Sequence, residues 1–236
     1  MMKKTILFAL GILLGQICFA QSSGGKIAIS KKTRNNLLFF GPKVGVGMTS
    51  FSGQPSECDL FDGGSIGFEA GVALNARWGK ATASSPQGTG MLGAAVELNY
   101  RQAMAKTIAD DDLSLGYLEV PVLFKCYPAA TRKALNGLYI EAGPEFAMLM
   151  SKSPDVMTVQ NNSLSAAYQS LAYHTGDLKG GDLRMVVGVG YTVPNTGLGF
   201  NARYHIGTSE LSENALPVKM CVLDLSIAWM FKLGAF

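Results

Sequence analysis

The sequence lacks any long apolar run after its N-terminal segment, which limits how it could cross a membrane. Apolar residues make up 48% of the chain. Beyond residue 20, however, they never form the run of about 18 or more residues that a transmembrane helix requires. A helical membrane protein is therefore excluded, and the apolar residues are spread over short segments instead.

Charged residues are also scarce. They account for 16% of the chain, and the formal net charge is +3. Loss of an N-terminal segment that contains Lys3 and Lys4 would lower this charge to +1. Such a weak net charge would not attract the negatively charged backbone of a nucleic acid, so no nucleic-acid partner is predicted.

Residues 1–20 have the features of a secretory signal peptide. Residues 1–4 form a short positive region, residues 5–15 form an apolar core too short to span a membrane, and cleavage is predicted near Ala20. Cys18 would suit a lipoprotein, but small residues do not precede it. We expect a signal peptide over 1–20, a flexible periplasmic segment over 21–37 and a folded domain over 38–236.

Residues 65–78 carry the clearest structural signal in the sequence. Every second side chain is apolar, at Ile66, Phe68, Ala70, Val72, Leu74, Ala76 and Trp78. The side chains between them are small, polar or charged. Successive side chains of a strand point to opposite faces, so this period predicts one long strand. Strands of soluble sheets usually have about 5–6 residues, and two such unlike faces are typical of a strand between lipid and a polar interior.

The same alternation occurs in seven other segments. They are residues 40–48, 92–101, 117–127, 138–150, 183–192, 198–207 and 221–233. Eight is an even number, as single-chain bacterial membrane barrels require. The sequence therefore predicts an all-β protein: an eight-stranded antiparallel up-and-down transmembrane β-barrel with a polar, charge-paired interior.

The polar faces of these segments carry both signs of charge. We predict an interior charge network of Lys43, Glu69, Arg77, Glu97, Arg101, Glu119, Lys125, Glu141, Glu145, Arg184, Arg203, His205, Asp224 and Lys232. An isolated buried charge costs several kcal/mol, so these charges must pair. A soluble ligand carrier would have the reverse arrangement, with an apolar interior. A soluble sheet with solvated charges would need a second layer over its apolar faces.

The connections and aromatic residues predict an orientation. Longer outer loops are expected at 49–64, 102–116, 151–182 and 208–220, and periplasmic turns at 79–91, 128–137 and 193–197. Aromatic rings favour the membrane interface. A periplasmic girdle is predicted at Phe40, Trp78, Tyr191 and Trp229.

Three segments resemble a known family. Residues 117–125 (YLEVPVLFK), 41–46 (GPKVGV) and 138–144 (LYIEAGP) are similar to the PorT-like outer-membrane β-barrel family of Bacteroidota. The resemblance covers roughly residues 38–236. It implies a small barrel in the outer membrane of a Gram-negative bacterium, and it suggests a link to type IX secretion or gliding. We expect β-bulges at Pro121 and Pro144, because proline has no backbone N–H to donate to a neighbouring strand.

Candidate chemistry is sparse. Ser209, His205 and Glu210 could form a nucleophile, base and acid for a lipid-modifying enzyme, but His205 points inward by parity. Cys126 and Cys221 are predicted to face lipid on opposite sides, too far apart for a disulfide. No metal-ligand spacing appears, so no catalytic, cofactor or metal site is predicted.

The predicted role is structural or accessory, with outer-membrane lipids around the barrel. A protein partner is expected at loops 49–64 and 151–182, and the barrel-insertion machinery at the C-terminal Phe236. A lipid-modifying enzyme and a narrow passive channel remain the alternatives.

Overall fold

The structure is a computed structural model of the 236-residue chain. It describes residues 36–52, 65–82, 87–106, 112–130, 132, 135–153, 156–160, 170–174, 178–210 and 219–235. All of them belong to one compact unit, Arg34–Phe236. The predicted signal peptide, a third cysteine of the predicted mature chain (Cys58, in the predicted outer loop 49–64) and Phe236 lie outside the described residues.

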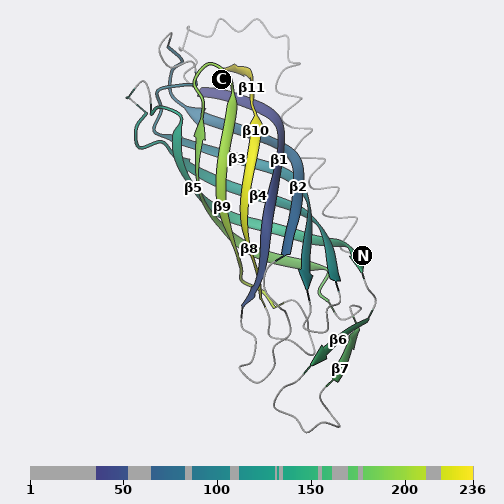
Figure 1. The fold of residues 1–236 in the computed structure, drawn as a ribbon. Coiled ribbons are helices and arrows are strands. Elements are labelled where there is room, and N and C mark those ends of the chain that lie inside the picture. Colours follow the sequence, from purple (N-terminus) through teal and green to yellow (C-terminus); the bar gives the residue numbers. More distant parts are fainter. Residues whose placement is uncertain are drawn as a thin grey trace, which may run out of the picture. The chain divides into compact units, whose positions relative to one another are not determined.

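The described strands form a closed antiparallel barrel (Figure 1). Their bounds are β1 (Asn36–Ser52), β2 (Ser65–Trp78), β3 (Leu92–Lys106), β4 (Asp112–Cys126), β5 (Leu138–Ser153), β8 (Gly181–Thr192), β9 (Leu198–Gly207), β10 (Lys219–Trp229) and β11 (Phe231–Ala235). The sheet order is β10-β9-β8-β5-β4-β3-β2-β1-β11, and β10 also pairs with β1. Only Met230 separates β10 from β11, so the two form one barrel strand. The predicted eight-stranded antiparallel barrel is confirmed.

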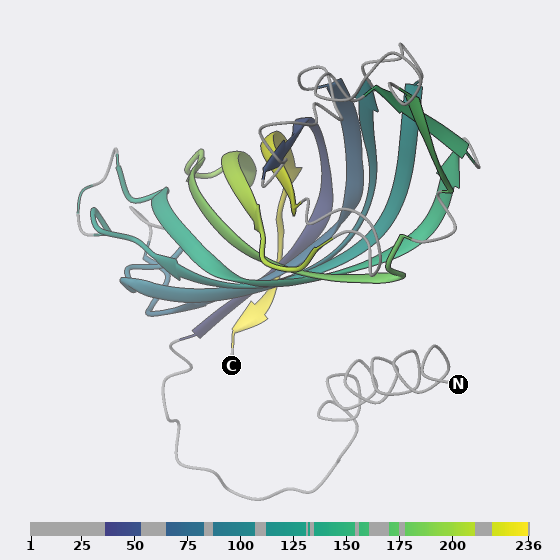
Figure 2. The ribbon, with the colours of Figure 1, turned by 90° about the horizontal axis from the view of Figure 1, so that it is seen from below.

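The alternating side chains take the two predicted faces. On β2, Ile66 is 71% exposed and Phe68 47% exposed, whereas Glu69 between Phe68 and Ala70 is 1% exposed. The strands curve around a common interior when viewed from below (Figure 2). The apolar outer face therefore follows directly from the period of two in the sequence.

The connections fall at two ends of the barrel. We call the end that carries residues 79–91, 127–137 and 193–197 the turn end, and the opposite end the loop end. In the β8–β9 turn, Asn195 and Gly197 have φ values of 69° and 74°, a left-handed conformation that these two residue types tolerate.

Within the predicted loop 151–182 the structure has two additional strands. β6 (Val156–Gln160) and β7 (Ser170–His174) pair as an antiparallel hairpin. Describing this whole segment as a loop was therefore wrong. Five residues are too few to show a sustained period of two, which is why the sequence did not reveal these strands.

The two prolines do not produce the bulges that were predicted. Pro121 pairs with Glu145 and Phe124 pairs with Ala142, so the β4–β5 register is the same before and after Pro121. Pro144 pairs with Met185 in an unbroken register with β8. The β4–β5 register shifts elsewhere, between Gly116 and Tyr117.

Candidate functional site

The barrel interior is filled by charged side chains from every barrel strand. Thirteen of the fourteen residues predicted for this network are at most 3% exposed: Lys43, Glu69, Arg77, Glu97, Arg101, Glu119, Lys125, Glu141, Glu145, Arg184, Arg203, His205 and Asp224. An eight-stranded barrel has room only for side chains inside, so these residues must satisfy one another.

Arg203 on β9 joins opposite walls of the barrel. Its Nη1 and Nη2 atoms donate to the two carboxylate oxygens of Glu97 on β3, each at 2.7 Å. Its Nε atom donates to Glu141 on β5 at 2.5 Å. In the closed strand order β9 and β3 are four strands apart in either direction, so the first contact crosses the full interior.

Arg101 on β3 is a second centre of the network. Its Nε donates to both oxygens of Glu119, at 2.9 and 3.0 Å, and Nη2 donates to Glu69. Nη1 lies 3.4 Å from Asp224 on β10, and Nη2 lies 3.3 Å from Nε2 of His205 on β9. This one guanidinium therefore contacts residues of four other strands.

Three further buried cations pair with interior carboxylates. Arg184 Nη1 donates to Glu119 at 2.7 Å, and Arg184 Nε donates to Asp182 at 2.5 Å. Lys43 pairs with Glu69 and lies 3.2 Å from Glu97, and Lys125 lies 3.3 Å from Glu141. The predicted charge-paired interior is confirmed in these contacts.

Lys232 does not belong to this network. It is exposed on β11, and no ion pair joins it to any residue that the structure describes. The strand is interrupted at Met230, whose N–H donates to Gly197 O at 2.9 Å, and the β1–β11 register shifts between Leu38 and Phe39. The prediction for Lys232 was wrong because it extended the alternation of inward and outward side chains past this interruption. Lys232 was expected in the buried interior but is exposed.

Arg77 is buried but differs from the other interior arginines. Among the described residues it pairs with no carboxylate. Its Nε donates to Gly90 O at 3.0 Å, and its guanidinium carbon lies 3.8 Å from the centre of the Tyr127 ring. Sequence parity placed this side chain correctly but could not indicate that it lies apart from the acids.

Two glycines leave space for the long cations. A Cβ at Gly47 would lie 2.8 Å from Arg101 Nη1, and a Cβ at Gly188 would lie 2.8 Å from Arg203 Cγ. Real Cβ atoms essentially never approach other atoms so closely. Gly47 therefore leaves room for the Arg101 guanidinium group, and Gly188 leaves room for the aliphatic stem of Arg203.

An apolar cluster closes the interior toward the loop end. It consists of Ala103, Ala105, Leu113, Leu115, Tyr117, Ala147, Met220 and Val222, all at most 5% exposed. The sequence alone did not indicate this cluster. These inward positions lie mostly beyond the predicted strand limits, at the loop-end extensions of β3, β4 and β10.

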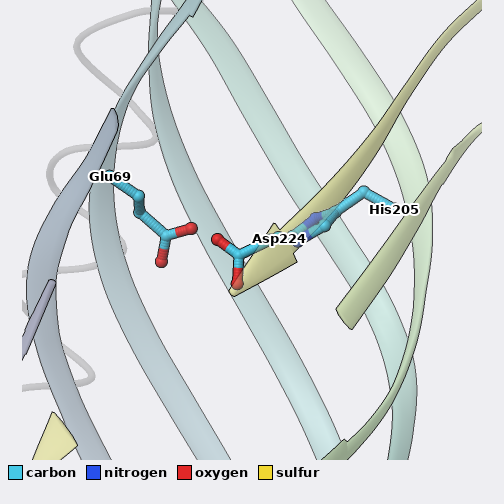
Figure 3. Close-up of side chains that lie close together, drawn as sticks. All are labelled: Glu69, His205 and Asp224. Carbon is cyan, nitrogen blue, oxygen red and sulfur yellow. The ribbon is translucent and has the colours of Figure 1, made fainter. Parts of the chain in front are cut away.

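Glu69, His205 and Asp224 lie close enough together to be considered as metal ligands (Figure 3). One potential ligand atom from each lies within 4.8 Å of the others. However, Glu69 already pairs with Lys43 and Arg101, and Asp224 lies 3.4 Å from Arg101. The chain's own cations occupy the positions around these acids, so the cluster fits an ionic network better than a metal centre.

The hypothetical catalytic triad is not assembled. His205 Nδ1 lies 3.0 Å from Glu145, and Nε2 faces Arg101. Ser209 Oγ instead contacts Asp182 and accepts a hydrogen bond from Leu183 N–H at 3.1 Å. Both nitrogens of the histidine ring therefore face partners other than Ser209.

The four girdle residues lie on the outer face at the turn end. Phe40 is 40% exposed, Trp78 38% and Trp229 56%, and Tyr191 is half-buried. The Trp229 ring stacks on Phe231, with ring centres 5.8 Å apart. An outward aromatic set at one end of the barrel is typical of a membrane interface.

Of the two described cysteines, only Cys126 is exposed. Cys221 also occupies an outward position, but it is 6% exposed and its Sγ lies 3.8 Å from Ser52 Oγ. The prediction that Cys221 faces lipid was therefore wrong, because neighbouring side chains cover it.

One side chain links two turns across the mouth at the turn end. Gln87, in the β2–β3 connection, donates from Nε2 to Val193 O of the β8–β9 turn at 2.8 Å. This hydrogen bond connects the described part of the β2–β3 connection to the β8–β9 turn. The sequence predicted a periplasmic turn at 79–91 and gave no sign of this contact.

An exposed apolar outer face around a closed, charge-filled interior defines a transmembrane β-barrel. No helix among the described residues is long and apolar enough to cross a membrane. The chain belongs to the family described as outer membrane protein beta-barrel domain, whose model matches residues 19–212. It is thus a small outer-membrane barrel protein.

Several solved barrels are similar in part. Neisserial surface protein A has 12% identity and a TM-score of 0.44, with 82% of this chain and 97% of that chain covered. OprG of Pseudomonas aeruginosa has 12% identity and a TM-score of 0.40, with coverage of 85% and 97%. Ail of Yersinia pestis has 13% identity and a TM-score of 0.36, with coverage of 82% and 98%. No curated protein matches the chain significantly.

Proposed function

We propose that this protein is a sealed outer-membrane barrel with a structural or partner-binding role, and that it is neither a channel nor an enzyme. The observation that carries the proposal is the Arg203–Glu97 contact, in which two hydrogen bonds of 2.7 Å join opposite walls. Other ion pairs surround this contact, and the apolar cluster lies beyond them toward the loop end.

A passive channel is the first alternative. An ion path would have to cross the Arg203 and Arg101 contacts and then the apolar cluster. We expect the purified protein in planar bilayers to give no stepwise conductance, while a known porin prepared in the same way serves as positive control. Reproducible unitary currents that disappear after specific removal of the protein would overturn this part of the proposal.

A lipid-modifying enzyme is the second alternative. Such an enzyme needs a nucleophile and base that reach lipid, whereas His205 is 1% exposed in the interior. We expect the mass spectrum of lipid A to be the same in the parent strain, a deletion strain and a strain with His205→Ala. A mass change that only the wild-type gene restores would support the enzyme instead.

A partner-binding role is favoured by the long connections at the loop end, which we propose face the cell exterior. The resemblance to PorT-like barrels supports a partner from type IX secretion or gliding. The proposed contact regions are 49–64 and 151–182, including the β6–β7 hairpin, while the turn end faces the periplasm. Insertion through the C-terminal Phe236 is part of the same proposal.

The test is crosslinking in intact outer membranes followed by affinity purification. A variant that replaces 156–174 with a short Gly-Ser linker removes the β6–β7 hairpin between β5 and β8. Its control carries a Gly-Ser replacement of 83–86 at the turn end. We expect the hairpin variant to lose a reproducible crosslinked protein that the control retains. Identical crosslinking in both variants, or none in the wild type, would contradict this contact region.

A further inference from the structure

A pocket opens at the turn end of the barrel, away from the proposed partner-binding loops. Its volume is about 360 Å³, within the range of small-ligand sites. It lies between the start of β1, the end of β2, the β8–β9 turn and β11. The side chains that matter below are Arg77, Asn75, Lys232, Phe39, Met230 and Phe231.

Arg77 is the first indication of a ligand. Its side chain lines the pocket and is 2% exposed, yet its Nη2 atom has no hydrogen-bond partner among the residues that the structure describes. Arg101, Arg184 and Arg203 each pair with at least two carboxylates. A buried cation without a counter-charge is costly, and the guanidinium fork is suited to carboxylate or phosphate oxygens.

The other lining residues give the site its chemical character. Lys232 supplies a second cation, and the described lining contains no aspartate or glutamate. Oδ1 of Asn75 is buried and has no hydrogen-bond partner within the described ranges, so this oxygen could accept a hydrogen bond from a hydroxyl of the ligand. Phe39, Met230 and Phe231 form an apolar part of the wall.

We propose that this pocket binds a small organic anion, in which a carboxylate or phosphate group lies between Arg77 and Lys232. A short apolar group of the ligand packs against Phe39 and Met230. The anion supplies the counter-charge that Arg77 lacks. The same chemistry is presented by a soluble metabolite and by the phosphate of a lipid headgroup.

The test uses phenyl phosphate, which combines both features, and benzyl alcohol as its neutral counterpart. Titration calorimetry is performed on the full-length mature protein in a neutral detergent. Wild type is expected to bind phenyl phosphate and to show no measurable heat of binding with benzyl alcohol. Loss of a charged hydrogen bond weakens binding by about tenfold or more, which is the change expected for Arg77→Gln and for Lys232→Gln.

Lys80→Gln is the matched control. Lys80 is an exposed lysine at the same end of the barrel and does not line the pocket. This variant should bind as wild type does. Lys232 is exposed, so Lys232→Gln is expected to fold even if Arg77→Gln does not. The proposal is overturned if wild type fails to bind phenyl phosphate at millimolar concentration, or if Lys232→Gln binds it with unchanged affinity.

A second arm distinguishes the two sources of the anion. The titration is repeated in nanodiscs of phosphatidylcholine with and without phosphatidylglycerol. If a lipid headgroup is the ligand, phosphatidylglycerol will compete and weaken phenyl phosphate binding to wild type. If the ligand is soluble, the affinity will be the same in both nanodiscs.

Discussion

Arg203 on β9 and Glu97 on β3 bridge opposite walls of the barrel through two parallel hydrogen bonds of 2.7 Å. Because both residues are almost completely buried, neither can exchange this contact for water. The pair holds together two strands that share no backbone hydrogen bonds. Barrel stability and closure of the interior therefore depend on the same contact.

Removing the cation from this pair should destabilise the barrel strongly. Arg203→Met leaves Glu97 and Glu141 without one of their counter-charges, and breaking a buried pair in this way costs about 3–5 kcal/mol in the free energy of unfolding. Urea unfolding in bilayers, followed by tryptophan fluorescence, measures this change. Lys80→Gln, an exposed control, should stay within about 0.5 kcal/mol of wild type.

A double-mutant cycle isolates the contact itself. Arg203→Met and Glu97→Gln together should cost less than the sum of the single changes by about 1 kcal/mol or more, because paired residues couple. Additive effects would mean that the two side chains do not interact directly.

A larger side chain at position 188 should destabilise the barrel, because Gly188 packs closely against Arg203. In Gly188→Val the new Cβ would lie 2.8 Å from Arg203 Cγ and 2.9 Å from Ala202 O. Such overpacking typically costs about 1–3 kcal/mol. The control is Gly181→Ala, where the nearest atom to the Cβ is Ala147 O at 3.9 Å. Equal unfolding midpoints for the two variants would contradict the packing argument.

A charged residue on the outer face should destabilise the barrel more when it lies near the bilayer midplane than when it lies near the membrane surface. Leu225 is 58% exposed and pairs with Val46 near the middle of β1, so Leu225→Arg places a charge within the lipid. The expected loss is about 2–4 kcal/mol at the bilayer midplane, against about 0–1 kcal/mol for Leu92→Arg at the start of β3. Unfolding from bilayers measures both. A barrel not surrounded by lipid would tolerate the two changes equally.

Breaking the hydrogen bond between Gln87 and Val193 should loosen the β8–β9 turn without lowering the stability of the whole barrel much. Gln87→Ala removes the hydrogen bond to Val193 O, a contribution of about 0.5–1.5 kcal/mol. We expect faster amide hydrogen exchange in residues 193–197 with little change in the core strands. Thr89→Ala is the control, because Thr89 Oγ1 donates to Lys80 O within its own connection. Exchange in 193–197 that responds equally to both changes would argue against the link.

The local alternation of apolar and polar residues was sufficient to predict the barrel strands and which of their side chains face outward. The alternation in residues 65–78 and 198–207 predicted β2 and β9 with their bounds as observed. Elsewhere the prediction stopped short. Several strands continue further into the loop end, through Thr49, Ala103, Ala105 and Leu115. The alternation of apolar and charged residues is lost there, and turn-forming residues such as Ser114 and Gly116 are present. The short strands β6 and β7 gave too little periodicity to be recognised.

The sequence by itself determined which side chains face inward, because direction along a strand depends only on parity. It could not determine which inward charges meet. Arg203 and Glu97 come together through barrel closure and strand register, and these are properties of the whole sheet. The same closure leaves Arg77 without a described carboxylate partner, while the interruption at Met230 removes Lys232 from the network. The direction of a side chain depends only on its position along its own strand. Which buried charges pair depends on distances between strands, and these distances are set only when the barrel closes.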